Sequence, residues 1–116
     1  VHLVRVKDRR QFNRVPEHLV IKRRQDPELG CSKDIMHEYE VLKGLDHPNI
    51  VKCYGYFWEQ RSEVLCLVLE YANRGDLQDE VQARAGLEKH FSDGEVWNIL
   101  GQLLHGLVYV HAKGIV

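Results

Sequence analysis

The sequence predicts an α+β fold, in which a small antiparallel sheet with one helix is followed by the start of a helical unit. Two apolar, β-rich runs, Ile50–Trp58 and Val64–Tyr71, are joined by the polar segment 59–62, which is typical of a β-hairpin. Ser92 and Glu95 form a capping box just ahead of a long apolar stripe at helical spacing. The expected order is therefore strand, strand, helix, strand, strand and then helices.

The front half is predicted to hold two strands and a helix. Val1–Val6 is short and rich in β-branched residues, and His18–Arg24 alternates between two faces, as strands do. The polar, basic stretch 7–17 suits a connecting loop. Asp34–Leu45 has apolar residues at helical spacing, and the turn at His47–Asn49 ends it because the residue before a proline is disfavoured in the α region.

The back half is predicted to be helical. Asn73–Asp76 breaks the preceding strand, and a short helix follows over Leu77–Ala85. A longer helix begins after Ser92 and runs to about His111. Its stripe repeats at i, i+3, i+4 and i+7, and consists of Val96, Ile99, Leu100, Leu103, Leu104, Leu107 and Val108.

The composition is that of an ordinary globular domain, with 116 residues, 44% of them hydrophobic and 28% charged. The longest strictly apolar run, Val64–Leu69, is far shorter than the roughly 20 residues of a membrane span, so no membrane partner is expected. Cys31, Cys53 and Cys66 are odd in number and form no C-x-x-C pair, which favours buried free thiols and a cytoplasmic protein, with the nucleus left open. The start at Val1 and the apolar final residues predict a piece of a larger protein.

The charges are unevenly placed along the chain. Residues 1–24 carry a net charge of +6, and the remainder carries −7. Such a front segment is either a site for nucleic acid or acidic peptide, or a solvated loop between strands. We expect the second and no nucleic-acid partner, because no aromatic stacking pattern or metal knuckle accompanies the charge. The charged residues concerned are Arg5, Lys7, Arg9, Arg10, Arg14, Lys22, Arg23 and Arg24, against Asp8 and Glu17.

Two charged residues occupy positions at which the helical and strand periodicities predict apolar residues. Glu38 falls on the same helical stripe as Ile35 and Leu42, and Lys22 shares a strand face with Val20. A carboxylate that faces a core is costly unless a cation meets it, so the two side chains could neutralise each other in a cleft. The other interpretation is that Glu38 flanks the stripe and Lys22 is an exposed strand end. Periodicity alone leaves both open.

Four segments together resemble the front part of a eukaryotic protein kinase domain. Leu19–Lys22 stands where the family has V-A-I-K, and His37–Val51 is similar to its C helix and the H-P-N-I-V turn after it. Leu67–Tyr71 is similar to the strand that leads into the hinge, and Tyr109–Val116 to the lead-in to the catalytic loop. These matches run in the family's order over nearly the whole chain.

The resemblance implies a protein-kinase-like N-lobe, made of an antiparallel sheet and the C helix, followed by the first helices of an incomplete helical C-lobe. In this division, residues 1–71 are the N-lobe without its glycine-rich loop, 72–76 the hinge and 77–116 the start of the C-lobe. Catalytic roles are implied for Lys22, which would bind the α/β-phosphates of ATP, and for Glu38, which would pair with it.

Further nucleotide-binding positions are implied by the same resemblance. Val1 would cover the adenine beside Val20, which replaces the usual alanine, and Leu69 would be the gatekeeper. The Glu70 carbonyl and the backbone of Ala72 would hold the adenine edge. Asp76 would accept a ribose hydroxyl, although a helix N-cap role is an equal alternative. These positions are Val1, Val20, Lys22, Leu69, Glu70, Ala72 and Asp76.

The implied activity is ATP-dependent phosphorylation of serine or threonine in protein substrates. The glycine-rich loop, the catalytic loop and the magnesium ligands of the family would lie outside residues 1–116, so no metal site is expected here and the isolated chain should be inactive. The alternative is a non-catalytic pseudokinase or kinase-like interaction module. Within the family, Gly75-Asp76-Leu77 and the basic front loop look most like NIMA-related kinases.

Overall fold

The computed structural model describes residues 1–6, 16–23, 32–59 and 64–116. They form two compact units, Val1–Tyr71 and Ala72–Val116. The predicted α+β class is confirmed, because the first unit is an antiparallel sheet with a helix and the second is helical. The sequence expectations that fall on the loop 7–15, on Arg24 and on Cys31 lie outside the described residues.

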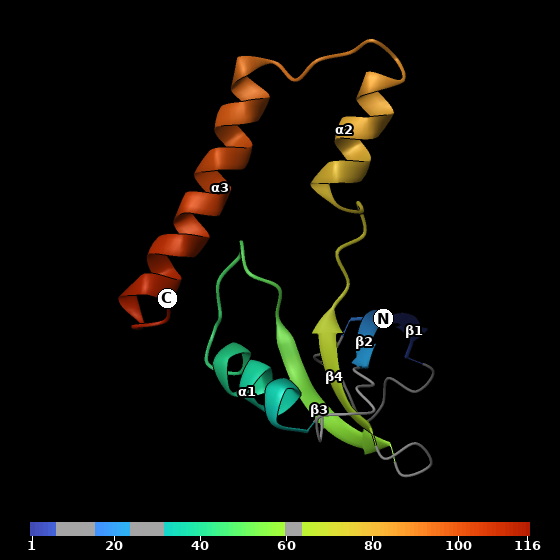
Figure 1. The fold of residues 1–116 in the computed structure, drawn as a ribbon, viewed down its shortest axis with the longest axis vertical. Helices are drawn as coiled ribbons and strands as arrows, with labels where there is room; N and C mark the ends of the chain where they lie inside the picture. Colours follow the sequence, from blue (N-terminus) through green and yellow to red (C-terminus); the bar gives the residue numbers. More distant parts are fainter. Residues whose placement is uncertain (7–15, 24–31, 60–63) are drawn as a thin grey trace. The chain divides into compact units, whose positions relative to one another are not determined.

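The first unit is built on a four-stranded antiparallel sheet with the spatial order β1-β2-β4-β3 (Figure 1). The strands are β1 (His2–Arg5), β2 (His18–Arg23), β3 (Cys53–Glu59) and β4 (Val64–Glu70). The long strand β4 is central, with β2 on one side and β3 on the other. The expected hairpin over the two apolar runs is thus present, and β2 pairs with its second strand rather than its first.

Helix α1 (Ser32–Leu42) lies along one face of this sheet and packs against β4 and β3 (Figure 1). Ile35 is fully buried and meets alternate residues of β4 in a cluster that forms the core: Ile35, Leu65, Leu67 and Leu69. Partly buried apolar side chains surround it, namely Val20, Met36, Tyr39, Leu42 and Cys53. Alternate residues of a strand point to the same face of the sheet. Because Leu65, Leu67 and Leu69 pack against Ile35, they define the face of the sheet that α1 covers.

Several element ends differ from the prediction by up to three residues. Helix α1 ends at Leu42 instead of Leu45, because the Leu45 N–H bonds the Leu42 carbonyl at 3.0 Å in a tight turn. Strand β3 begins at Cys53 instead of Ile50, whose N–H closes a turn on the His47 carbonyl at 3.1 Å. Strands β1 and β4 are also shorter than predicted, ending inside the expected ranges.

Strand β3 contains a bulge between Cys53 and Gly55. Gly55 has φ of +151°, a conformation that side chains rarely adopt, and an extra residue in one strand accounts for the shifted register. The bulge places Cys53 opposite Leu69 of β4. The half-buried Cys53 side chain packs against the core cluster.

The second unit holds helices α2 (Leu77–Ala85) and α3 (Asp93–Ala112), close to the predicted ranges. The predicted capping box is confirmed: the Ser92 hydroxyl accepts the Glu95 N–H, and the Glu95 carboxylate accepts the Ser92 N–H at 2.8 Å. The apolar stripe of α3 is largely exposed, with Leu103 at 63%. No helix in the described ranges has the length and apolar character needed to cross a membrane.

Candidate functional site

The most informative contact of the first unit joins Lys22 on β2 to Glu38 on α1. The Lys22 ammonium donates to both carboxylate oxygens, at 2.7 Å to Oε1 and 2.9 Å to Oε2. The two residues are sixteen positions apart in the sequence. Of the two interpretations that periodicity leaves open, the structure supports the one in which these two charges neutralise each other.

This ion pair is only half-buried, which corrects the expectation of a carboxylate facing a core. The Lys22 side chain is 38% exposed and that of Glu38 is 31% exposed. Among the described residues, no charged or polar one is fully buried. The pair thus lies at the border of the core, where a ligand can reach the ammonium group.

The sheet and the helix each place one partner. Lys22 lies opposite Leu67 in the register of β2 and β4, so it faces the same side as the core residue. Glu38 follows the buried Ile35 by three positions on α1, which brings it to a neighbouring part of the same helix face. Burial of Ile35 and Leu67 therefore fixes the distance between the two charges.

Two of the other predicted nucleotide-binding residues share this face. Val20 lies two residues before Lys22 and opposite Leu69, and it packs against the core cluster. Leu69 itself is 8% exposed. Val1 precedes β1 and its side chain is 78% exposed. The structure thus brings Val20, Lys22 and Leu69 together and leaves Val1 at the surface.

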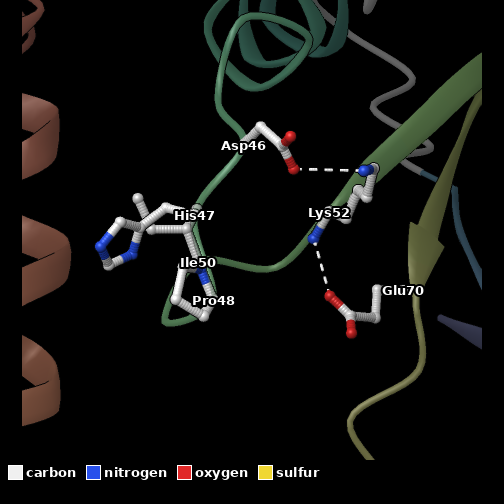
Figure 2. A pocket seen from close by; sticks show the side chains of 6 residues that line it. All are labelled: Asp46, His47, Pro48, Ile50, Lys52 and Glu70. Carbon is white, nitrogen blue, oxygen red and sulfur yellow. Dashed lines mark hydrogen bonds and ion pairs between the residues drawn. The ribbon is translucent and has the colours of Figure 1, made fainter.

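The end of β4 carries a contact that the sequence analysis missed. The Glu70 carboxylate accepts the main-chain N–H of Lys52 at 3.0 Å, and the Lys52 ammonium contacts Asp46 at 3.2 Å. Figure 2 shows these groups around a pocket of about 330 Å³ that is also lined by His47, Pro48 and Ile50. No local sequence pattern predicts the contact between the Glu70 side chain and the main chain of Lys52, because the two residues are eighteen positions apart.

The remaining predicted positions belong to the second unit. Ala72 is exposed and lies outside the helices. Asp76 is the N-cap of α2, and its Oδ1 accepts the Asp79 N–H at 2.8 Å. The N-cap alternative considered from the sequence is thus observed, whereas a ribose contact stays a prediction.

The described cysteines are free thiols, as expected. Cys66 is buried, whereas Cys53 is only half-buried, contrary to the prediction that both would be inside. Burial raises the pKa of both thiols above the usual range, so the neutral forms are favoured. In the part of the chain described here, no group of three or more His, Cys, Asp or Glu side chains could hold a metal ion.

Comparison with known proteins assigns the family. The sequence model described as "Protein kinase domain" matches residues 6–116. The chain belongs to the protein kinase domain family. The sheet with α1 and the helices that follow are consistent with a kinase N-lobe and the start of a C-lobe.

Individual relatives include serine/threonine-protein kinase Aurora-1 of Arabidopsis thaliana, 32% identical over the whole chain and 36% of the relative. Aurora kinase B of Mus musculus is 33% identical over 75% of the chain and 24% of its own length. Cytokinesis protein sepH of Aspergillus niger is 39% identical over 71% of the chain and 6% of its own length. The chain therefore spans little more than a third of these relatives at most. The expected likeness to NIMA-related kinases finds no support among them.

Proposed function

We propose that the protein transfers the γ-phosphoryl group of ATP to serine or threonine side chains of protein substrates. The observation that carries this proposal is the Lys22–Glu38 ion pair, with both carboxylate oxygens within 2.9 Å of the ammonium. Membership of the kinase domain family supports the reaction class. The relatives named as serine/threonine-protein kinases support the acceptor type.

In this proposal, Lys22 supplies positive charge to the α- and β-phosphate oxygens and Glu38 orients it. A lysine ammonium has three N–H groups. Two of them go to Glu38, which leaves one for a phosphate oxygen. The 38% exposed side chain can make this contact without breaking the pair, so the residues fit the nucleotide.

The adenine edge is proposed to meet the end of β4 and the segment after it. The Glu70 carbonyl and the backbone of Ala72 provide the hydrogen bonds, Val1 and Val20 cover the ring, Leu69 is the gatekeeper and Asp76 accepts a ribose hydroxyl. Residues 72–76 then form the hinge. Magnesium belongs to the same proposal through the family, and no residue of this chain is assigned to it.

At the subfamily level, the printed names of the relatives favour an Aurora-like kinase over a NIMA-related one. No finding favours the alternative of a non-catalytic module. Retention of the Lys22–Glu38 pair is what an ATP-binding kinase needs.

The test is phosphate transfer by the full-length protein from radiolabelled ATP to a generic protein substrate such as casein. Lys22→Met should reduce transfer by about 100- to 1000-fold, because it removes an electrostatic contact to the phosphates. Lys43→Met is the matched control, since Lys43 pairs with Glu40 on the exposed side of the same unit. Equal activity of wild type and Lys22→Met would refute the proposal.

A further inference from the structure

Lys22 belongs to a row of three side chains that crosses the face of the sheet under α1. Lys22 of β2 lies opposite Leu67 of β4, and Tyr56 of β3 lies opposite the same leucine on its other side. Residues directly opposite each other in antiparallel strands share a face of the sheet. Leu67 packs in the core cluster with Ile35 of α1, so the whole row lies on the face that α1 covers.

Tyr56 reaches this row because of the bulge in β3. Cys53 lies opposite Leu69, so an unshifted ladder would bring Gly55 opposite Leu67 two positions further along. The extra residue of the bulge moves the register by one, and Tyr56 takes that place instead. The bulge therefore puts an aromatic ring where the regular strand would have a glycine.

Helix α1 contacts this row in the middle and at both ends. Ile35 packs into the core cluster in the middle. At one end, the Glu38 carboxylate accepts a hydrogen bond from the Lys22 ammonium at 2.7 Å. At the other end, the rings of Tyr39 and Tyr56 meet edge to face, with centroids 4.6 Å apart and planes inclined by 66°. Helical residues are about 100° apart around the axis, so Glu38 lies about 60° to one side of Ile35 and Tyr39 about 40° to the other.

We propose that Tyr39 and Tyr56 are positioning residues, which hold the β3 side of α1 so that Glu38 stays within reach of Lys22. This role rests on the proposed function, in which the ion pair presents the ammonium to the phosphates of ATP. Ile35 lies between the two contacts, and the burial of an aliphatic side chain has no preferred direction. An edge-to-face aromatic pair has a preferred geometry, so it resists rotation of the helix about Ile35.

The two tyrosines can be altered without opening the centre of the core. Tyr56 is 47% exposed, so shortening its side chain removes the ring contact and little buried surface. Tyr39 packs at the margin of the core cluster, and the Lys43 ammonium lies 5.6 Å from the centroid of its ring. Ile35 and Leu67 stay in place in both cases, so the sheet and the helix keep their main contact.

The first experiment measures phosphate transfer from ATP to casein by full-length variants. Tyr56→Ala should lower the rate about three- to tenfold, as expected for the loss of one aromatic pair. In a Glu38→Gln background, the same substitution should change the rate by less than about twofold, because Tyr56 acts through Glu38. A general loss of structure would lower the rate by the same factor in both backgrounds, and that result would overturn the inference.

The second experiment follows the ion pair without using activity. A carbodiimide joins an amine to a carboxylate with no spacer, so it couples the two groups only where they are in contact. Peptide mass spectrometry of the full-length protein then measures the yield of the Lys22–Glu38 amide, which should fall about three- to tenfold in Tyr56→Ala. The Lys43–Glu40 pair lies within one short segment, so its yield should stay constant and serves as the internal reference.

Three further variants separate positioning from a general loss of structure. Tyr39→Leu removes the ring contact from the helix side and keeps an apolar side chain against the core, so it should repeat both effects. Tyr56→Phe retains the ring and should stay within about twofold of wild type in both experiments. Phe57→Ala is the matched control and should do the same, because Phe57 is 42% exposed and lies opposite Cys66, on the face away from α1.

Failure of this positioning role can be told apart from failure of the proposed function. An unchanged Lys22–Glu38 yield in Tyr56→Ala and Tyr39→Leu, or an equal fall in Phe57→Ala, would overturn the role of the tyrosines, while Lys22-dependent transfer would still support a kinase. A reduced yield in the two tyrosine variants of a protein without Lys22-dependent transfer would refute the proposed function and leave the positioning role supported.

Discussion

Lys22 and Glu38 are joined by two hydrogen bonds between a strand and a helix, and yet about a third of each side chain remains exposed. A pair so accessible to solvent gains little net free energy, because water screens the charges and ordering the side chains costs entropy. The pair is therefore expected to contribute little to stability, and its role in the proposed function is to hold the Lys22 ammonium in place.

The first prediction is that substitutions at this pair reduce phosphate transfer strongly but change the free energy of unfolding little. Lys22→Met and Glu38→Gln should each change the free energy of unfolding by less than about 1 kcal/mol. Each should nevertheless abolish most phosphate transfer, and the double variant should be little worse than either single one, as for residues that act as a unit. Denaturant titration and steady-state kinetics on the full-length variants measure the two effects. Additive losses of activity would mean that the side chains do not pair in the active state.

The second prediction concerns pH and the link between α2 and α3. Arg84 donates to Glu95 at 2.7 Å, and this contact, followed by bonds from Ser92, lowers the pKa of the Glu95 carboxyl from its ordinary 4.5 to about 2. Because the folded pKa is lowered, the stabilisation is present above about pH 4.5 and is lost as pH falls toward 2. NMR titration of the Glu95 carboxyl carbon should show a midpoint well below 4.5.

Two arginine variants test whether Arg84 causes the lowered pKa of the Glu95 carboxyl. Arg84→Met should return the Glu95 midpoint toward its ordinary value, because it removes the largest contribution. Arg74→Met, an exposed arginine of the same unit for which no contact to Glu95 is seen, should leave the midpoint where it is. A midpoint unaffected by loss of Arg84 would contradict the assigned cause.

The third prediction concerns the core under the candidate site. Ile35 has no exposed surface and contacts the core residues of β4, so Ile35→Ala should cost about 2 to 5 kcal/mol of unfolding free energy. Ile35→Val should cost only about 0.5 to 1.5 kcal/mol, since it removes one methyl group. The neighbouring half-buried Met36 offers a comparison, and Met36→Ala should cost less than Ile35→Ala. Equal costs would show that α1 is not anchored through Ile35.

The fourth prediction uses the connection between α2 and α3. Glu88 has φ of +53°, in the left-handed region that is unfavourable for residues with a side chain. Glu88→Gly should therefore raise the free energy of unfolding by about 0.5 to 1 kcal/mol, after the entropy cost of glycine is subtracted. Lys89→Gly, at a position without positive φ, should lower it. Thermal unfolding of the two variants compares them, and a loss of stability in Glu88→Gly would be the contrary result.

The local elements were largely predictable because their signals lie within a few residues. The capping box of Ser92 and Glu95 and the range of α2 were read directly from neighbouring residues. The end of α1 was not predicted correctly, because Leu45 stays buried outside the helix and so continues the apolar periodicity past the helix end. The start of β3 was also misplaced, because Ile50 belongs to a turn closed on the His47 carbonyl. Periodicity records which residues are buried, not which ones keep helical hydrogen bonds.

By itself, the sequence determined the class of the fold, the order of its elements and the identity of two charged residues on apolar faces. Only the tertiary structure decided that Lys22 and Glu38 meet at 2.7 Å and stay accessible, because their distance depends on how α1 packs across β4. The same holds for the Glu70 carboxylate, whose bond to the Lys52 N–H needs the β3–β4 pairing first. Contacts between residues far apart in the chain depend on the packing of whole elements, and no local pattern encodes that packing.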